Sequence, residues 1–78
     1  MDRATILSRV IKLVSETLEC DADGLSEASR YDELGADSFD LLELVTAFED
    51  EFGITMDDEA LQAIETLGDS VDAIVSAQ

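Results

Sequence analysis

The sequence predicts an all-α fold: a bundle of four helices, three long and one short, with a long loop between the first and second helices. Apolar residues recur at steps of three and four through most of the 78-residue chain, and no segment alternates as a strand does. The chain contains no proline that would interrupt these periods. A chain of this length has room for a single hydrophobic core, so we expect one domain over residues 1–78.

The first helix is expected over about residues 3–19, where apolar side chains such as Ile6 and Val10 follow the helical period. The period stops near Cys20. Residues 21–37 are rich in Asp, Ser, Gly and Ala, a composition that predicts a loop. A loop this long in a small protein is usually pinned by apolar residues. The residues available for this are Leu25, Tyr31 and Leu34.

The second helix is the clearest element of the sequence. It should run from Ser38 to Phe52, and Gly53 is suited to cap its C-terminal end. Ile54 and Met56 then provide apolar anchors in a short connector. The apolar stripe expected to be buried on this helix comprises Leu41, Leu44, Val45, Phe48 and Phe52.

Two further helices complete the prediction. A brief third helix is expected near residues 58–64, and the acidic run from Asp57 to Glu59 suits the positive end of its dipole. Thr66 is a good N-cap for the last helix, with Asp69 as its capping-box partner. The residues of that helix expected to face the core are Leu67, Val71, Ile74 and Val75.

The charge of the chain restricts its partners. Twenty acidic side chains against four basic ones give a formal net charge of −16, and residues 31–78 contain no Lys or Arg. Such a surface cannot neutralise phosphates, so no nucleic acid is expected as a partner, and an anionic membrane surface is disfavoured. The chain also lacks the run of about 18 apolar residues that membrane insertion requires. The charge therefore serves either solubility alone or electrostatic steering toward basic protein surfaces.

The compartment is predicted from the cysteine content and the N-terminus. Cys20 is the single cysteine, so no internal disulfide can form, as is usual in a reducing compartment. The first residues contain no secretory apolar segment. The sequence begins at Met1 and ends shortly after the last predicted helix, so we expect a discrete cytoplasmic protein, monomeric, rather than a module of a larger synthase.

Catalytic and metal-binding classes are disfavoured. The chain contains no histidine, so a Ser-His-Asp triad cannot exist, and Ser38 does not stand in a Gly-x-Ser-x-Gly turn. One cysteine without histidine does not make a zinc site. A calcium loop starting at Glu19 would place Arg30 where a bidentate glutamate is required. We therefore expect no catalytic residues and no metal ligands.

Ser38 is the residue with the most distinctive position. It begins a helix after a loop that contains Gly35, where free backbone N–H groups and the helix dipole favour a phosphate ester on its hydroxyl. A serine at such a position is, by itself, more often an N-cap. The same helix carries acidic residues without Lys or Arg at helical spacing. Phe39 and Leu42 lie off its buried stripe, so they contact either a partner or the long loop.

The segment from Glu33 to Phe52, ELGADSFDLLELVTAFEDEF, resembles the signature of the acyl carrier proteins, which is usually centred on an Asp-Ser-Leu tripeptide. The resemblance continues without a gap beyond this segment, and the first helix and loop agree in length and pattern. It thus covers nearly the whole chain. The later positions that match the family pattern are Ile64, Thr66, Asp72 and Ile74.

The resemblance implies a cofactor and a carrier function. In the family, a holo-carrier-protein synthase (a phosphopantetheinyl transferase) uses magnesium to transfer 4′-phosphopantetheine from coenzyme A to the serine that matches Ser38. The thiol of this arm carries acyl groups as thioesters to acyl-transfer and chain-elongation enzymes with basic docking patches. The positions that match the partner-binding surface are Asp37, Phe39, Asp40, Leu42, Glu43 and Glu49. The positions that would shelter the acyl chain are Leu41, Phe48, Met56, Leu61 and Ile64.

The sequence also departs from the usual family pattern. Phe39 replaces a leucine, Thr46 a common methionine and Asp57 a frequent proline. The bulk of Phe48 and Leu61 leaves open whether a long acyl chain fits inside. Fatty acid biosynthesis is the first expectation for the pathway, and peptidyl carriers are disfavoured. The alternatives are a specialised carrier for polyketide or other lipid or secondary-metabolite synthesis, or an unmodified helical adaptor that only binds proteins.

Overall fold

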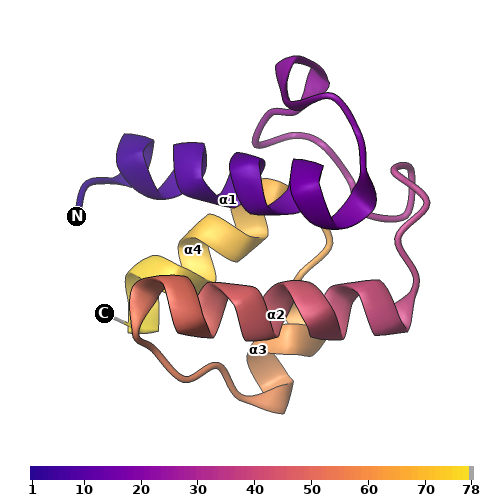
Figure 1. Cartoon of the computed structure of the whole chain (residues 1–78). Helices are drawn as coiled ribbons and strands as arrows, with labels where there is room; N and C mark the ends of the chain where they lie inside the picture. The colour runs from indigo at the N-terminus through magenta and orange to yellow at the C-terminus, as the bar shows by residue number, and fades with distance from the viewer. Residues whose placement is uncertain (78) are drawn as a thin grey trace.

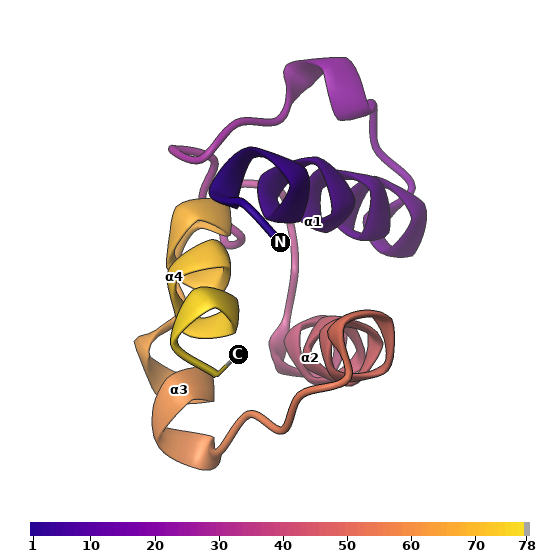
Figure 2. The ribbon, with the colours of Figure 1, turned by 90° about the vertical axis from the view of Figure 1, so that its left-hand side faces the viewer.

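The computed structural model describes residues 1–77 and contains four α-helices in this range. They are α1 (Arg3–Leu18), α2 (Ser38–Phe52), α3 (Asp58–Ala63) and α4 (Leu67–Ala77). A single 3₁₀ turn at Ala22–Gly24 lies in the long loop after α1. Helices α1 and α2 run antiparallel to each other, and α4 crosses beside both with α3 at its lower end (Figures 1 and 2). The predicted number, order and relative lengths of the helices agree with this arrangement.

The core lies where α1, α2 and α4 meet. All three helices contribute an apolar stripe, and α1 packs against both α2 and α4. The core is completed by Leu25 and Tyr31 of the long loop and by Ile64, which follows α3. The buried apolar residues are Ile6, Val10, Val14, Leu25, Tyr31, Leu44, Val45, Phe48, Ile64, Leu67, Val71 and Ile74.

Several expected helix ends and burials differ slightly in the structure. Helix α1 ends at Leu18, because Glu19 adopts a left-handed conformation with φ of 54°. Helix α3 ends at Ala63, and the next residue, Ile64, is extended and buried. Val75 was expected to face the core but is 45% exposed, since it lies on the outer side of the last turn of α4. Leu41 and Phe52, expected in the buried stripe of α2, are only partly buried against the core.

The long loop is fastened to α4, and this fixes the start of α2. Tyr31 is 1% exposed, and its hydroxyl lies 2.6 Å from that of Ser70, which is also fully buried. The Tyr31 backbone N–H donates to the Glu65 carbonyl at 3.0 Å. The Gly68 N–H donates to the carbonyl of Glu27 at 3.0 Å, and a Cβ at position 68 would lie only 3.1 Å from that carbonyl oxygen. Glycine at this position thus lets the loop approach α4 closely, because any larger residue would crowd the Glu27 carbonyl.

Candidate functional site

A capping box begins α2 at Asp37, one residue before Ser38. The Asp40 N–H donates to Asp37 Oδ1 at 2.9 Å, and the Asp37 N–H donates to Asp40 Oδ2 at 3.2 Å. This reciprocal pair satisfies backbone groups that a helix start otherwise leaves without partners. The N-cap is thus Asp37, and Ser38 is the first helical residue. The interpretation of Ser38 as an N-cap is therefore wrong.

The Ser38 side chain is left available by this arrangement. Ser38 is exposed, and its hydroxyl has no hydrogen-bond partner within residues 1–77. In the same range, the Ser38 and Phe39 backbone N–H groups find no acceptor, because the cap reaches only the Asp40 N–H. These N–H groups lie at the positive end of a helix of 15 residues. A phosphodiester on the Ser38 oxygen thus fits the residues that surround it.

A turn at the end of the long loop places the chain at the start of α2. Gly35 has φ of 82°, a left-handed conformation that favours glycine. The Ala36 N–H donates to the Tyr31 carbonyl at 3.0 Å, which closes the turn. Because Tyr31 is anchored in the core, the turn and the start of α2 are held at a fixed place on the molecule.

The residues that follow Ser38 present an apolar face to solvent. Phe39 is 82% exposed and Leu42 is 54% exposed, so neither packs against the long loop. The alternative in which these two side chains contact the loop is therefore wrong. They share a shallow hollow with acidic neighbours, and none of the described residues that border it is basic. The hollow is lined by Phe39, Leu42, Glu43, Thr46, Ala47 and Asp50.

Some of the acidic residues on α2 are engaged within the protein. Asp37 and Asp40 form the capping box, whereas Glu43 is exposed. Glu49 Oε2 accepts a hydrogen bond from the Met56 N–H at 2.8 Å, which fastens the connector to α2. Glu51 forms an ion pair of 2.7 Å with Arg9 of α1, a pairing that helical spacing alone cannot reveal.

The residues expected to shelter an acyl chain do not line one common pocket in the structure. Leu41 and Ile64 border a cavity of about 250 Å³. Met56 also borders a hollow, of about 470 Å³, together with Ile64 and residues of α3 and α4. Phe48 is 1% exposed within the core, and neither it nor the half-buried Leu61 lines these two hollows.

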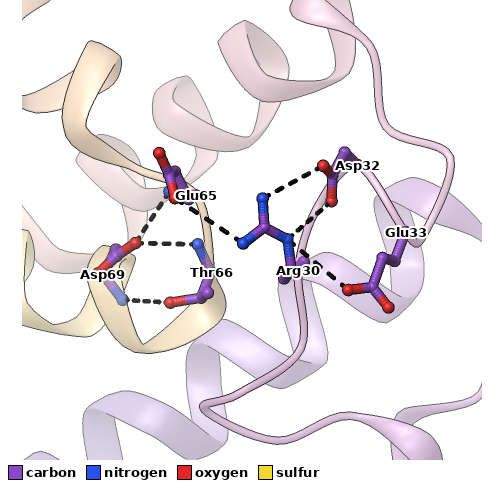
Figure 3. A network of polar contacts seen from close by, with 6 residues as sticks. All are labelled: Arg30, Asp32, Glu33, Glu65, Thr66 and Asp69. Atoms are coloured by element: carbon purple, nitrogen blue, oxygen red, sulfur yellow. Dashed lines mark hydrogen bonds and ion pairs between the residues drawn. The ribbon is translucent and has the colours of Figure 1, made fainter.

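The wall of the smaller cavity includes residues that the sequence did not single out. Arg30 and Glu65 border it, and their side chains belong to one polar network (Figure 3). Arg30 makes two hydrogen bonds to Asp32, and Thr66 and Asp69 form the predicted capping box beside them. The signal for Arg30 was its position as the last cation of the sequence, after which every charged residue is acidic.

Two titratable groups near the site have displaced pKa values. The Glu65 and Thr66 N–H groups donate to Asp69, at 3.0 and 3.1 Å, and lower the pKa of its carboxyl. Burial raises the pKa of Tyr31 to about 12, which exceeds the opposing effect of its hydrogen bond to Ser70. At neutral pH, Asp69 is therefore charged and Tyr31 neutral.

Within residues 1–77, no three His, Cys, Asp or Glu side chains are arranged to hold a metal ion. None of the helices described here has the length and apolar character needed to cross a membrane.

Comparisons with known proteins converge on one family. The family described as "Phosphopantetheine attachment site" matches residues 8–74. Acyl carrier proteins of Sinorhizobium fredii and Rhizobium meliloti are each 51% identical to this chain over 74 residues, which cover 94% of this chain and 95% of each relative.

Solved structures give the same result. The acyl carrier protein of Enterococcus faecalis superposes with a TM-score of 0.83 at 39% identity and covers both chains fully. That of Thermotoga maritima gives 0.84 at 31% identity, with 99% of this chain and 91% of the other covered. The predicted all-α fold and the predicted family are thus confirmed.

Proposed function

Because this chain belongs to the acyl carrier proteins, it carries acyl groups on a phosphopantetheine arm, and we propose that the arm is attached at Ser38. The observation that carries this proposal is the exposed Ser38 hydroxyl, which stands unpartnered within residues 1–77 at the first position of α2. When bound, the arm supplies a terminal thiol that holds the acyl group as a thioester. The capping box at Asp37 keeps the helix start formed without using the serine.

The attachment reaction requires a second protein. A bond forms between the Ser38 oxygen and the phosphorus of coenzyme A that bears the pantetheine arm. The P–O bond from this phosphorus to the adenosine side of the pyrophosphate breaks, adenosine 3′,5′-bisphosphate leaves with the bonding electron pair, and a base takes the hydroxyl proton. We propose that the transferase supplies the base, because this chain has no histidine and the carboxylates of Asp37 and Asp40 are engaged in the cap. The resemblance to the family implies that the transferase also holds the magnesium. We infer that the chain is a carrier and not an enzyme.

The partner-binding surface proposed here is the outer face of α2. Phe39 and Leu42 offer apolar contact area, and Glu43 beside them offers a carboxylate that has no partner within residues 1–77. A basic patch on a partner enzyme complements this face, and the net charge of −16 accelerates the encounter. Asp37, Asp40 and Glu49 have roles inside the chain, so we expect them to contribute to binding mainly through their charge.

For the pathway, we propose fatty acid biosynthesis in the cytoplasm, with acyl-transfer and chain-elongation enzymes as partners. The 51% identity to acyl carrier proteins of two bacteria supports this proposal. A specialised carrier is the second candidate, and the specific observation that favours it is Phe39. This bulky ring is 82% exposed at the position next to Ser38, where a transferase or partner must fit closely.

Tandem mass spectrometry tests the attachment site. The protein is incubated with coenzyme A, magnesium and a broad-specificity phosphopantetheinyl transferase, and then digested. We expect the added phosphopantetheine on the peptide that contains Ser38. Recovery of the group on a peptide with another serine, such as Ser26 or Ser29 of the loop, contradicts the proposed site.

A further inference from the structure

A small cavity lies along the segment that contains the proposed attachment point. It has a volume of about 250 Å³ and is bordered by Ala36 and Leu41, between which Ser38 stands in the sequence. Tyr31 and residues 64–65 form other parts of its wall. This volume is below the roughly 300–1,000 Å³ of pockets that take drug-sized ligands. The cavity therefore suits a short chain.

The wall of this cavity is partly apolar and partly charged. Leu41 and Ile64 provide aliphatic surface, whereas the charged groups belong to Arg30, Asp32 and Glu65. An unsubstituted alkyl chain in this cavity would cover the charged groups without offering them a hydrogen bond. Covering a polar group in this way costs free energy. The composition thus favours a cargo that is partly apolar and carries a hydrogen-bonding group.

Arg30 has hydrogen-bond donors that are not used within residues 1–77. Its guanidinium has five N–H groups, of which two donate to Asp32, at 3.2 and 3.3 Å. The contacts with Glu33 and Glu65, at 3.6 and 3.9 Å, are too long for hydrogen bonds (Figure 3). The remaining three N–H groups therefore have no acceptor within residues 1–77. Arg30 is 44% exposed, so solvent or a ligand can reach them.

The charges around Arg30 determine which acceptor fits. Three carboxylates, those of Asp32, Glu33 and Glu65, lie within 4 Å of the one guanidinium. An anionic cargo would meet a net negative environment and be repelled. A neutral oxygen, such as a hydroxyl or keto group, accepts a hydrogen bond without this repulsion.

We propose that Arg30 is a specificity-determining residue that favours short acyl chains bearing a neutral oxygen substituent near the thioester. The aliphatic part of the cargo contacts Leu41 and Ile64, and the oxygen accepts a hydrogen bond from the guanidinium. This inference rests on the attachment of the arm at Ser38.

The test compares two cargoes of equal length on the same protein. A phosphopantetheinyl transferase transfers butanoyl-phosphopantetheine or 3-hydroxybutanoyl-phosphopantetheine from the corresponding acyl-coenzyme A to Ser38 of the unmodified protein, and intact mass verifies each product. The rate of thioester cleavage by hydroxylamine is then measured and divided by the rate for the same acyl group on free pantetheine. We expect the protein to protect the hydroxylated thioester about fivefold more than the saturated one, the effect of one hydrogen bond of ordinary strength.

A matched pair of variants assigns the effect to Arg30. Arg30→Met removes all five donors and keeps the aliphatic stem, and it should make the two protection factors equal. Arg9→Met is the control, because Arg9 is also 44% exposed and ion-paired but lies against Glu51 at the other end of α2. It should retain the difference.

Each other outcome overturns the inference. Equal protection of both cargoes in the wild-type protein shows that Arg30 does not select the substituent. An equal loss in both arginine variants assigns the effect to overall charge. Failure of a folded protein to accept the arm at all refutes the attachment at Ser38, and the inference falls with it.

Discussion

The buried hydrogen bond between Tyr31 and Ser70 should hold the long loop on the core, and the two partners should contribute unequally. Both side chains are at most 1% exposed, and their hydroxyl oxygens are 2.6 Å apart. In Ser70→Ala, the phenol is buried without a partner, which costs about 1–3 kcal/mol. In Tyr31→Phe, Ser70 can turn to the carbonyl of Thr66, the N-cap residue four positions earlier, so only about 0.5–1.5 kcal/mol is lost.

The double variant completes the cycle. With both hydroxyls removed, no buried polar group lacks a partner, so the combined loss should be smaller than the sum of the two single losses. Domains of this size have unfolding free energies of about 4–12 kcal/mol, and a loss of about 1 kcal/mol lowers Tm by about 4–8 °C. Urea denaturation followed by circular dichroism measures each step. Additive losses, or a larger loss in Tyr31→Phe than in Ser70→Ala, would refute this reasoning.

The burial of Tyr31 gives a pH dependence of stability whose sign follows from the raised pKa. The unfolded tyrosine titrates near 10.0 and the folded one at about 12, so the unfolded state loses its proton first. The contribution of Tyr31 to stability is therefore complete below pH 10 and decreases as the pH rises toward 12. The absorbance of this single tyrosine reports its titration directly. A midpoint near 10 in the folded protein would contradict its burial.

Three further predictions concern the helix cap, the docking face and the acid limb of stability. Asp37→Ala should lose about 0.5–2 kcal/mol of unfolding free energy because it removes the cap, whereas Ser38→Ala should lose almost none, as measured by urea denaturation; equal losses would place the cap elsewhere. Glu43→Lys should slow association with a partner enzyme in a salt-dependent manner. Glu16→Lys on α1 makes the same charge change and should not slow it. Association rates from stopped-flow measurements that fall equally in the two variants would contradict a docking face on α2. Above pH 3.8, the ordinary pKa of the carboxyl, Asp69→Asn should be less stable than the wild type. The difference in stability should vanish as the pH falls through the lowered pKa of Asp69 in the folded protein. A difference that stays constant across the pH range in denaturation experiments would exclude a role for the Asp69 charge.

Local patterns in the sequence were sufficient to predict the helices and two of their caps. The capping box of Thr66 and Asp69 depends on a spacing of three residues, and the structure contains it with bonds of 3.1 Å. The position of Gly53 after the last apolar residue of α2 likewise predicted its left-handed cap, with φ of 64°. Such features require only neighbouring residues, so they can be recognised without knowledge of the fold.

The residue at which α2 starts could not be predicted from local patterns. Asp37 and Ser38 are both good N-cap residues, and the sequence does not distinguish a helix that starts at one from a helix that starts at the other. The difference matters for function, because the Ser38 hydroxyl is free only when Asp37 is the cap. The capping bond from Asp40 decides between them in the structure.

Contacts between distant segments could not be predicted. The pairing of Arg9 with Glu51 and the bond of Tyr31 to Ser70 join residues more than 35 positions apart, and no periodicity relates them. The wall that Arg30 and Glu65 share beside Leu41 also arises only when the loop lies against the α3–α4 turn. The resemblance to acyl carrier proteins supplied the expectation for Ser38, and the loop contacts determine its surroundings.

The attachment of phosphopantetheine at Ser38 is tested most directly by intact-protein mass spectrometry of the wild type and Ser38→Ala after incubation with coenzyme A, magnesium and a phosphopantetheinyl transferase. We expect the wild type to gain the mass of one phosphopantetheine and the variant to gain none, with circular dichroism spectra that coincide. A gain that persists in Ser38→Ala, or a folded wild type that gains nothing, would contradict the account.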